Sequence, residues 1–108
     1  MCTKLYIIVR SDLSPGLQAA QACHALREFG EKHPELDAEW FAKSKTLVLL
    51  QARDKPHLES LSCKATEIAV RQAQNFEPDL GGELTAIALA PEAKKLVHTL
   101  PLLLQSGS

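Results

Sequence analysis

Short aliphatic runs, each followed by a helix-forming segment, recur along this sequence. The first run, residues 4–10, carries apolar side chains at consecutive positions, which is typical of a strand covered on both faces. A turn-forming stretch follows, in which Ser14 is placed as an N-cap and Pro15 as the first residue of a helix. The helical pattern continues to Gly30, a residue type that commonly ends helices. This opening predicts an α/β fold.

The same periodicity predicts the remaining elements. Further strands are expected at residues 45–51, 73–76 and 84–90, further helices at 36–42, about 55–72 and about 91–98, and a short edge strand or tail at 100–104. The element order indicates one α/β sandwich, in which a mixed four-stranded sheet has helices on both faces. We expect residues 1–105 to form this single domain and residues 106–108 to be a flexible tail.

The charge balance excludes a uniformly basic, nucleic-acid-binding surface. The formal net charge is −1, with 23% charged and 45% apolar residues, which is ordinary for a globular domain. An RNA partner would therefore need a local basic patch. The cations that flank the second predicted strand are the candidates: Lys43, Lys45, Arg53 and Lys55. A solvated face is the alternative interpretation of these charges.

The three cysteines indicate neither a disulfide framework nor a zinc site, because Cys2, Cys23 and Cys63 are odd in number and widely spaced. Reduced thiols in a cytoplasmic protein are the simpler interpretation, and Cys23 is expected to pack as a small apolar residue. The apolar runs are too short for a signal peptide or a membrane span. Nothing in the sequence requires a metal or an organic cofactor.

A polar pair interrupts the alanine-rich helix predicted after the first strand. Gln21 and His24 are three residues apart and therefore lie on the same helical side. Small neighbours allow such a helix to approach a sheet closely. The pair is a candidate for catalysis, and the alternative is that Gln21 satisfies backbone groups while His24 is a hydrogen-bonded structural histidine.

The loop before the last predicted strand is a second candidate site. Asp79 lies beside Gly81 and Gly82, so a carboxylate and backbone N–H groups can approach a bound substrate together. The alternative is a solvated turn in which Asp79 caps its own backbone. Gly81 and Gly82 lack the spacing of a phosphate-binding or dinucleotide-binding loop.

Arg10 and Asp12 stand at the carboxyl end of the first predicted strand. Open α/β sheets bind ligands at this end of their strands, so both residues are candidates for substrate binding. A surface ion pair is the alternative.

The order of these segments resembles that of the type II peptidyl-tRNA hydrolases of archaea and eukaryotes, including their shorter bacterial relatives. The resemblance covers nearly the whole chain and is carried by residues 9–13, the 19–25 helix, the 46–50 strand, the Asp79 loop and residues 85–91. The pattern Ala-Ala-Gln-x-x-His-Ala after a first strand is its most specific part. The family cleaves the ester that links a stranded peptide to the 3′-terminal ribose of tRNA. The resemblance therefore implies hydrolase activity, a tRNA partner and a possible homodimer.

The resemblance also implies that Gln21, His24, Asp79 and Thr85 occupy functional positions. Ester hydrolysis needs an activated water, a fixed carbonyl and donors for the developing oxyanion. Asp79 is expected to orient or deprotonate the water, and His24 or Gln21 to orient the ester and ribose. Thr85 and loop amides are expected to serve as hydrogen-bond donors.

Two departures from the family pattern leave other functions open. The family has a lysine two residues before the Ala-Ala-Gln, where this chain has Leu17, and the segment between Asp79 and Thr85 is shorter than in typical members. A cation at that position is thought to contribute to catalysis, and leucine supplies neither charge nor donors. The first hypothesis is a peptidyl-tRNA hydrolase. The alternatives are a catalytically impaired module that binds a tRNA end or a protein partner, and a hydrolase of a different small ester or amide.

Overall fold

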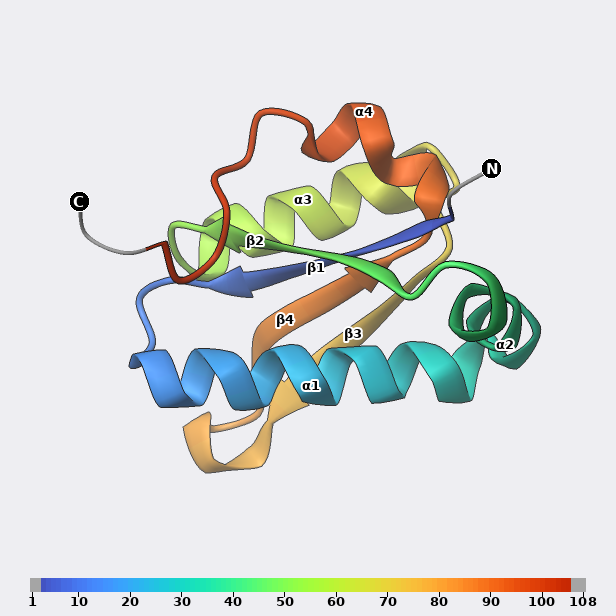
Figure 1. The fold of residues 1–108 in the computed structure, drawn as a ribbon. Coiled ribbons are helices and arrows are strands. Elements are labelled where there is room, and N and C mark those ends of the chain that lie inside the picture. Colours follow the sequence, from blue (N-terminus) through green and yellow to red (C-terminus); the bar gives the residue numbers. More distant parts are fainter. Residues whose placement is uncertain (1–2, 106–108) are drawn as a thin grey trace.

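The centre of the molecule is a twisted sheet of four strands, seen in a computed structural model that describes residues 3–105 (Figure 1). The strands are β1 (Lys4–Arg10), β2 (Thr46–Ala52), β3 (Gln72–Glu77) and β4 (Glu83–Leu89), in the spatial order β2-β1-β4-β3. β1 is parallel to β2 and antiparallel to β4, and β3 is antiparallel to β4. The predicted mixed four-stranded sheet is confirmed. The predicted tail at 106–108 lies outside the described residues.

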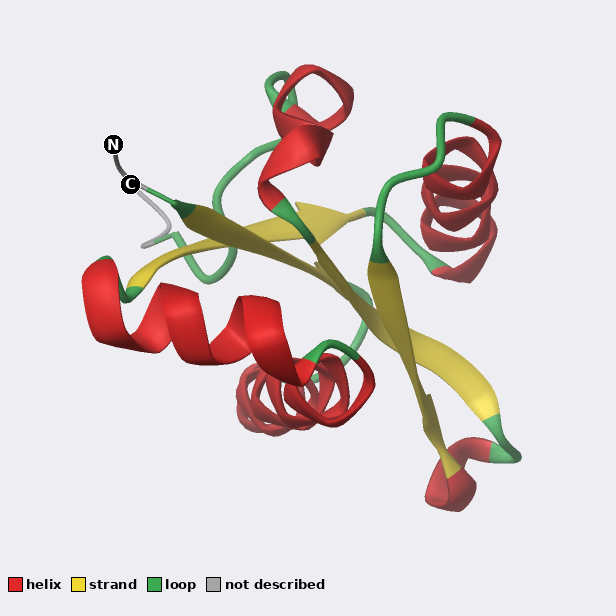
Figure 2. Ribbon diagram, turned by 90° about the vertical axis from the view of Figure 1, so that its right-hand side faces the viewer, coloured by secondary structure: helices red, strands yellow, loops and turns green. Residues whose placement is uncertain are grey.

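Helices cover both faces of this sheet, as Figure 2 shows. The longest are α1 (Pro15–Lys32), α2 (Pro34–Lys43) and α3 (Lys55–Glu67), followed by the single-turn α4 (Lys94–Val97). Two short 3₁₀ turns, η1 (Pro78–Leu80) and η2 (Pro91–Ala93), flank β4. Within residues 3–105, no helix has the length and apolar character that crossing a bilayer requires.

The consecutive apolar residues of β1 supply two separate cores. Ile7 and Val9 pack in the core beneath α1 and α2, which also contains the fully buried Phe29. Ile8 packs in the core on the other face with Leu58 of α3. Successive strand residues point to opposite faces, so a strand covered on both sides must be apolar at every position.

Three local predictions were wrong. α3 ends at Glu67 rather than near residue 72, because Ala69 adopts a φ of 59° and the N–H of Val70 donates to the carbonyl of Ala65. The expected final helix is divided between η2 and the short α4. Cys23 is exposed rather than packed, because the sheet-facing side of α1 carries Gln18, Gln21, Ala22, Ala25 and Phe29.

The segment after α4 lies along part of the free edge of β2. Leu102 forms an isolated antiparallel bridge with Leu50, and the N–H of Leu103 donates to the carbonyl of Leu49 at 2.9 Å. The prediction of a short edge strand or tail at 100–104 therefore takes the form of one bridge.

An exposed ion pair fastens the start of β3 to η2. The Nε and Nη2 atoms of Arg71 donate to the two carboxylate oxygens of Glu92, each at 2.9 Å, and the backbone N–H of Arg71 donates to the same group at 3.1 Å. These hydrogen bonds lower the pKa of Glu92 from 4.5 to about 2.

Acidification from about pH 4.5 to about pH 2 is expected to remove the contribution of Glu92 to the free energy of unfolding. A carboxyl whose pKa is lowered by folding stabilises the protein above its unfolded pKa, and this stabilisation is lost as the pH falls through the folded pKa. Both side chains are partly exposed, so the loss is at most about 1 kcal/mol. Urea denaturation of the parent and Glu92→Gln across this range measures it. An equally steep pH dependence in the variant would contradict the assignment.

Candidate functional site

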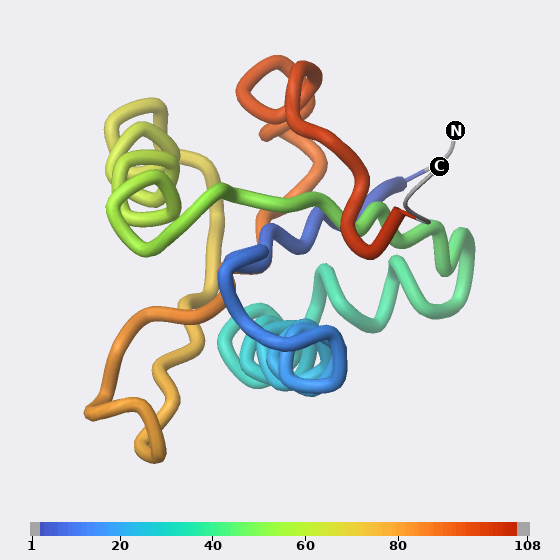
Figure 3. The backbone as a smooth tube through the Cα atoms, turned by 90° about the vertical axis from the view of Figure 1, so that its left-hand side faces the viewer, coloured from blue at the N-terminus to red at the C-terminus, as the bar shows by residue number. Residues whose placement is uncertain are grey.

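Most of the predicted site residues lie at one end of the strands. Because β1 and β2 are parallel and β4 is antiparallel to β1, this end of the sheet holds the carboxyl ends of β1 and β2 and the start of β4. The N-termini of α1 and α3 and the β3–β4 hairpin lie at the same end, which faces the viewer in Figure 3. Open α/β sheets bind ligands at the carboxyl ends of their strands.

A buried polar cluster connects α1 to β3 and β4. Asn75 Nδ2 donates to Gln21 Oε1 at 2.6 Å and to Thr85 Oγ1 at 3.1 Å. The hydroxyl of Thr85 lies 2.6 Å from the same Gln21 oxygen and 3.2 Å from the carbonyl of Asn75. Gln21 and Thr85 are fully buried and Asn75 is 8% exposed. The structure thus brings two predicted site residues, Gln21 and Thr85, into direct contact.

The amide nitrogen of Gln21 has no hydrogen-bond partner among the described residues, although it is buried. An unsatisfied buried donor costs about 1–3 kcal/mol, and such groups are uncommon in folded proteins. This nitrogen is therefore the unusual feature of the cluster, and it lies on a residue that the sequence already marked as a catalytic candidate.

Asn75 is the member of the cluster that sequence reasoning missed. It lies in the weakest predicted strand, beside the equally polar Gln74, so its residue type did not distinguish it. The available signal was its position two residues after Ala73. Residues two apart on a strand point to the same face, and Ala73 belongs to the core beneath α1. Only the contact with Gln21, 54 positions away in sequence, reveals its role.

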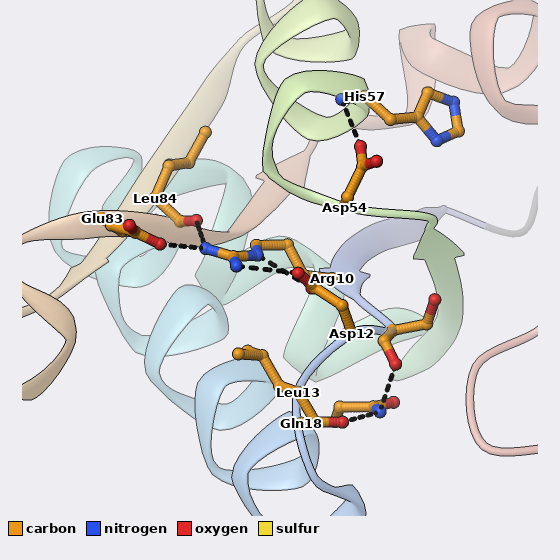
Figure 4. A network of polar contacts seen from close by, with 9 residues as sticks. Arg10, Asp12, Leu13, Gln18, Asp54, His57, Glu83 and Leu84 are labelled. Carbon is orange, nitrogen blue, oxygen red and sulfur yellow. Dashed lines mark hydrogen bonds and ion pairs between the residues drawn. The ribbon is translucent and has the colours of Figure 1, made fainter.

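A second polar network joins the end of β1 to the start of β4 (Figure 4). Arg10 Nε and Nη2 donate to the two carboxylate oxygens of Asp12 at 3.0 and 2.9 Å. Its Nη1 donates to Glu83 at 2.8 Å and to the carbonyl of Leu84 at 3.2 Å. Hydrogen bonding to the guanidinium lowers the pKa of both carboxyls, and hydrogen bonding to Asp12 raises the pKa of Arg10. All three nitrogens of Arg10 are thus engaged within the protein.

The loop between β1 and α1 is held by the side chain of Gln18. Its Nε2 donates to the carbonyls of Ser11 and Leu13 at 3.2 and 2.5 Å (Figure 4). Ser14 caps α1 as predicted, since its Oγ accepts from the N–H of Leu17 at 3.4 Å. These contacts fix the loop that carries Asp12.

The β3–β4 hairpin presents Asp79 on its exposed η1 turn. Gly81 and Gly82 have φ values of 69° and 78°, a region that side chains disfavour, so glycine allows this tight return. Their N–H groups donate to the carbonyls of Pro78 and Glu77. These two amides are therefore used to close the hairpin, and their part in substrate binding stays a prediction.

Asp79 and His24 differ from the buried cluster in being exposed. Within residues 3–105, neither side chain has a hydrogen-bond or ion-pair partner, so both can meet a substrate. His24 lies one helical turn before Glu28, which lines a surface hollow with Ala73 and Gln74 of β3. His24 is therefore placed on the β3 side of α1, but the structure records no contact that joins it to Asp79.

The four cations of the predicted basic patch divide between opposite ends of β2. Lys43 and Lys45 precede the strand, whereas Arg53 and Lys55 follow its carboxyl end. Seven residues of strand separate the pairs by about 20 Å. Of these four cations, only Arg53 and Lys55 lie at the end of the sheet that holds the site. In the part of the chain that the structure describes, no group of three or more His, Cys, Asp or Glu side chains could hold a metal ion.

The fold and site define an α/β protein with a buried amide–hydroxyl cluster beneath a hairpin that carries an exposed carboxylate. The family described as peptidyl-tRNA hydrolase PTH2 matches residues 3–104, so the chain belongs to the PTH2 family. A solved structure of a protein of unknown function from Agrobacterium tumefaciens strain C58 is similar in fold, with a TM-score of 0.71 and 14% identity. The similarity covers 94% of this chain and 98% of that one. No curated protein matches the sequence.

Proposed function

We propose that this protein hydrolyses the ester bond of peptidyl-tRNA and so releases tRNA for reuse in the cytoplasm. The observation that carries the proposal is its membership of the PTH2 family over residues 3–104. Two features of the site support it. Gln21 and Thr85, which belong to the family signature segments, meet in a buried cluster, and Asp79 is exposed on the neighbouring hairpin.

The proposed reaction is attack of water on the carbonyl carbon of the peptidyl ester. Asp79 orients the water and takes its proton as the carbon–oxygen bond forms. The resulting oxyanion is stabilised by a hydrogen-bond donor, for which the Nε2 group of Gln21 is the candidate, because the hydroxyl proton of Thr85 is engaged by Gln21 Oε1. Collapse of this intermediate breaks the bond to the ribose oxygen, which takes the proton back from Asp79 and leaves as the terminal hydroxyl of tRNA. His24 is proposed to orient the ribose.

Recognition of tRNA is proposed to involve Arg53 and Lys55. The net charge of −1 provides no general attraction for RNA, so binding depends on cations near the site. Arg53 and Lys55 stand at the N-terminus of α3, where the helix dipole also favours phosphate. Arg10 and Asp12 contribute by holding the hairpin, while Gly81 and Gly82 shape its turn.

Single-turnover hydrolysis of N-acetyl-aminoacyl-tRNA by the purified protein tests the proposal. We expect release of the N-acetyl-amino acid at a rate that saturates with enzyme and exceeds spontaneous hydrolysis. Filter binding of the same tRNA at increasing salt provides the second readout. Salt-sensitive binding without cleavage would replace the hydrolase by a tRNA-binding module. Cleavage of simple esters alone would indicate a different small substrate.

Leu17→Lys is expected to raise kcat by roughly 10-fold, because a positioned cation stabilises developing negative charge in the reaction. Leu17 lies half-buried in the first turn of α1, at the end of the sheet that holds the site. Leu17→Gln is the matched control, since it adds polarity and length without charge. Steady-state kinetics on N-acetyl-aminoacyl-tRNA measures the effect. Equal rates for the two variants would show that charge at this position is irrelevant here.

A homodimer stays a proposal drawn from the family resemblance. Light scattering coupled to size-exclusion chromatography decides it, because a dimer has twice the mass of the 11.8 kDa chain.

A further inference from the structure

The orientation of the Gln21 amide is decided by its neighbours on the sheet. Gln21 Oε1 lies 2.6 Å from both Asn75 Nδ2 and Thr85 Oγ1, so donors from β3 and β4 converge on one oxygen. A carbonyl oxygen accepts two such bonds with its two lone pairs. The remaining polar atom of the side chain, Nε2, is the one left without a partner.

Asn75 is the member of the cluster that enforces this orientation. A threonine hydroxyl can donate or accept, so Thr85 alone would permit either end of the Gln21 amide to face the sheet. The Nδ2 group of Asn75 can only donate, and it bonds both Gln21 Oε1 and Thr85 Oγ1. With Nδ2 in this place, Gln21 Nε2 facing the sheet would set two donors against each other.

We propose that Asn75 is a positioning residue, which holds Gln21 so that its amide N–H groups face a reacting acceptor oxygen. The inference rests on the proposed function for the identity of that oxygen, which is either the ester carbonyl or a water bound in the site. A buried donor without a partner weakens the free protein and gains a bond only when an acceptor is present. Only an interaction that is stronger in the reacting complex than in the free protein can accelerate the reaction, and such a donor meets this condition.

Asn75→Asp tests the orientation directly, because it keeps the size of the side chain and replaces its donor by an acceptor. At neutral pH the carboxylate can only accept, so the Gln21 amide is expected to turn and donate Nε2 to it. In NMR spectra, the Gln21 side-chain N–H resonances should then shift downfield relative to the parent. Unchanged resonances would overturn the proposal, whether or not the protein is a hydrolase.

The kinetic consequence is a fall in kcat of roughly 100-fold with KM altered less than about threefold, the size expected for one misdirected donor. The difference in kcat between Asn75→Asp and the parent should become smaller as the pH is lowered, since a protonated carboxyl can again donate to Gln21 Oε1. A purely structural defect would not recover in acid. The matched control is Gln74→Glu, the same amide-to-carboxylate change on the next, exposed residue of β3, which should leave kcat and the Gln21 resonances unchanged.

Chemical denaturation shows whether Asn75→Asp is folded. If it is not, Asn75→Leu replaces it, because leucine removes the donor without adding charge, and the Gln21 resonances must again move. In the parent, cross-peaks from the Gln21 N–H protons to water identify water as the acceptor, whereas a shift on adding N-acetylpuromycin identifies a carbonyl.

The two proposals fail in different ways. An inactive parent whose Gln21 amide turns in Asn75→Asp would refute the hydrolase but not the positioning role. An active parent whose kcat is unchanged in Asn75→Asp would refute the positioning role but not the hydrolase.

Discussion

Asp79→Ala is expected to slow single-turnover hydrolysis of N-acetyl-aminoacyl-tRNA by about 100- to 10,000-fold, the usual contribution of a general base. The residue is exposed on η1, and no other described side chain pairs with it, so its loss removes chemistry rather than a structural contact. The free energy of unfolding should therefore change by less than about 0.5 kcal/mol.

The matched control for Asp79→Ala is Glu59→Ala, which removes an exposed carboxylate from α3 on the other face of the sheet. This control corrects for the general effect of a lost negative charge on tRNA binding. Asp79→Asn distinguishes the two possible roles of the carboxylate, since an amide can still orient a water but cannot take its proton. Full activity in Asp79→Ala would exclude Asp79 as the base and leave the exposed His24 as the next candidate.

Arg10→Ala is expected to lower the free energy of unfolding by about 2–3 kcal/mol. The Arg10 side chain is 9% exposed and its guanidinium bonds Asp12, Glu83 and the carbonyl of Leu84, so its removal leaves two carboxylates and one carbonyl without their donor. This loss of stability is smaller than is usual when a buried ion pair is broken, because Asp12 and Glu83 are 39% and 42% exposed and can be rehydrated. Urea denaturation measures the loss.

Arg71→Ala provides a matched comparison within the same protein. Arg71 also binds a carboxylate through two nitrogens, but its side chain is 52% exposed, so its removal should cost less than about 1 kcal/mol. Arg10→Ala should also lower hydrolysis more than Arg71→Ala, because Arg10 ties the end of β1 to the start of the strand that follows the Asp79 hairpin. Equal losses of stability at the two positions would show that burial of Arg10 contributes little.

Local patterns were sufficient for most of the fold. β1 was predictable because its unbroken apolar run suits a strand between two layers of helices. The start of α1 was predictable because Ser14 and Pro15 act through contacts within one turn of the chain. The end of α3 was not, since the positive φ of Ala69 serves to turn the chain toward the pairing of β3 with β4. Long-range pairing therefore overrode local helix propensity at that point.

The candidate site was predictable only in part, for the same reason. Gln21, His24, Asp79 and Thr85 were marked by motif, but nothing in the sequence separates the buried pair from the exposed pair. The structure makes that division: Gln21 is buried against the sheet, whereas the side chain of His24 is exposed. A spacing of three residues places two side chains near one another on a helix without stating which of them is covered.

The sequence by itself determined the succession of elements, the family and the residue types available for chemistry, because these follow from side-chain periodicity and from motifs within short segments. The tertiary structure alone decided how the Gln21 amide is oriented, since its oxygen is bound by residues 54 and 64 positions away. It also decided that Arg10 is engaged by Glu83, 73 residues distant, and not available as an open cation. Hydrogen bonds act over about 3 Å, so their partners are set by the register of β4 beside β1 and β3 and by the packing of α1 on the sheet, and not by distance along the chain.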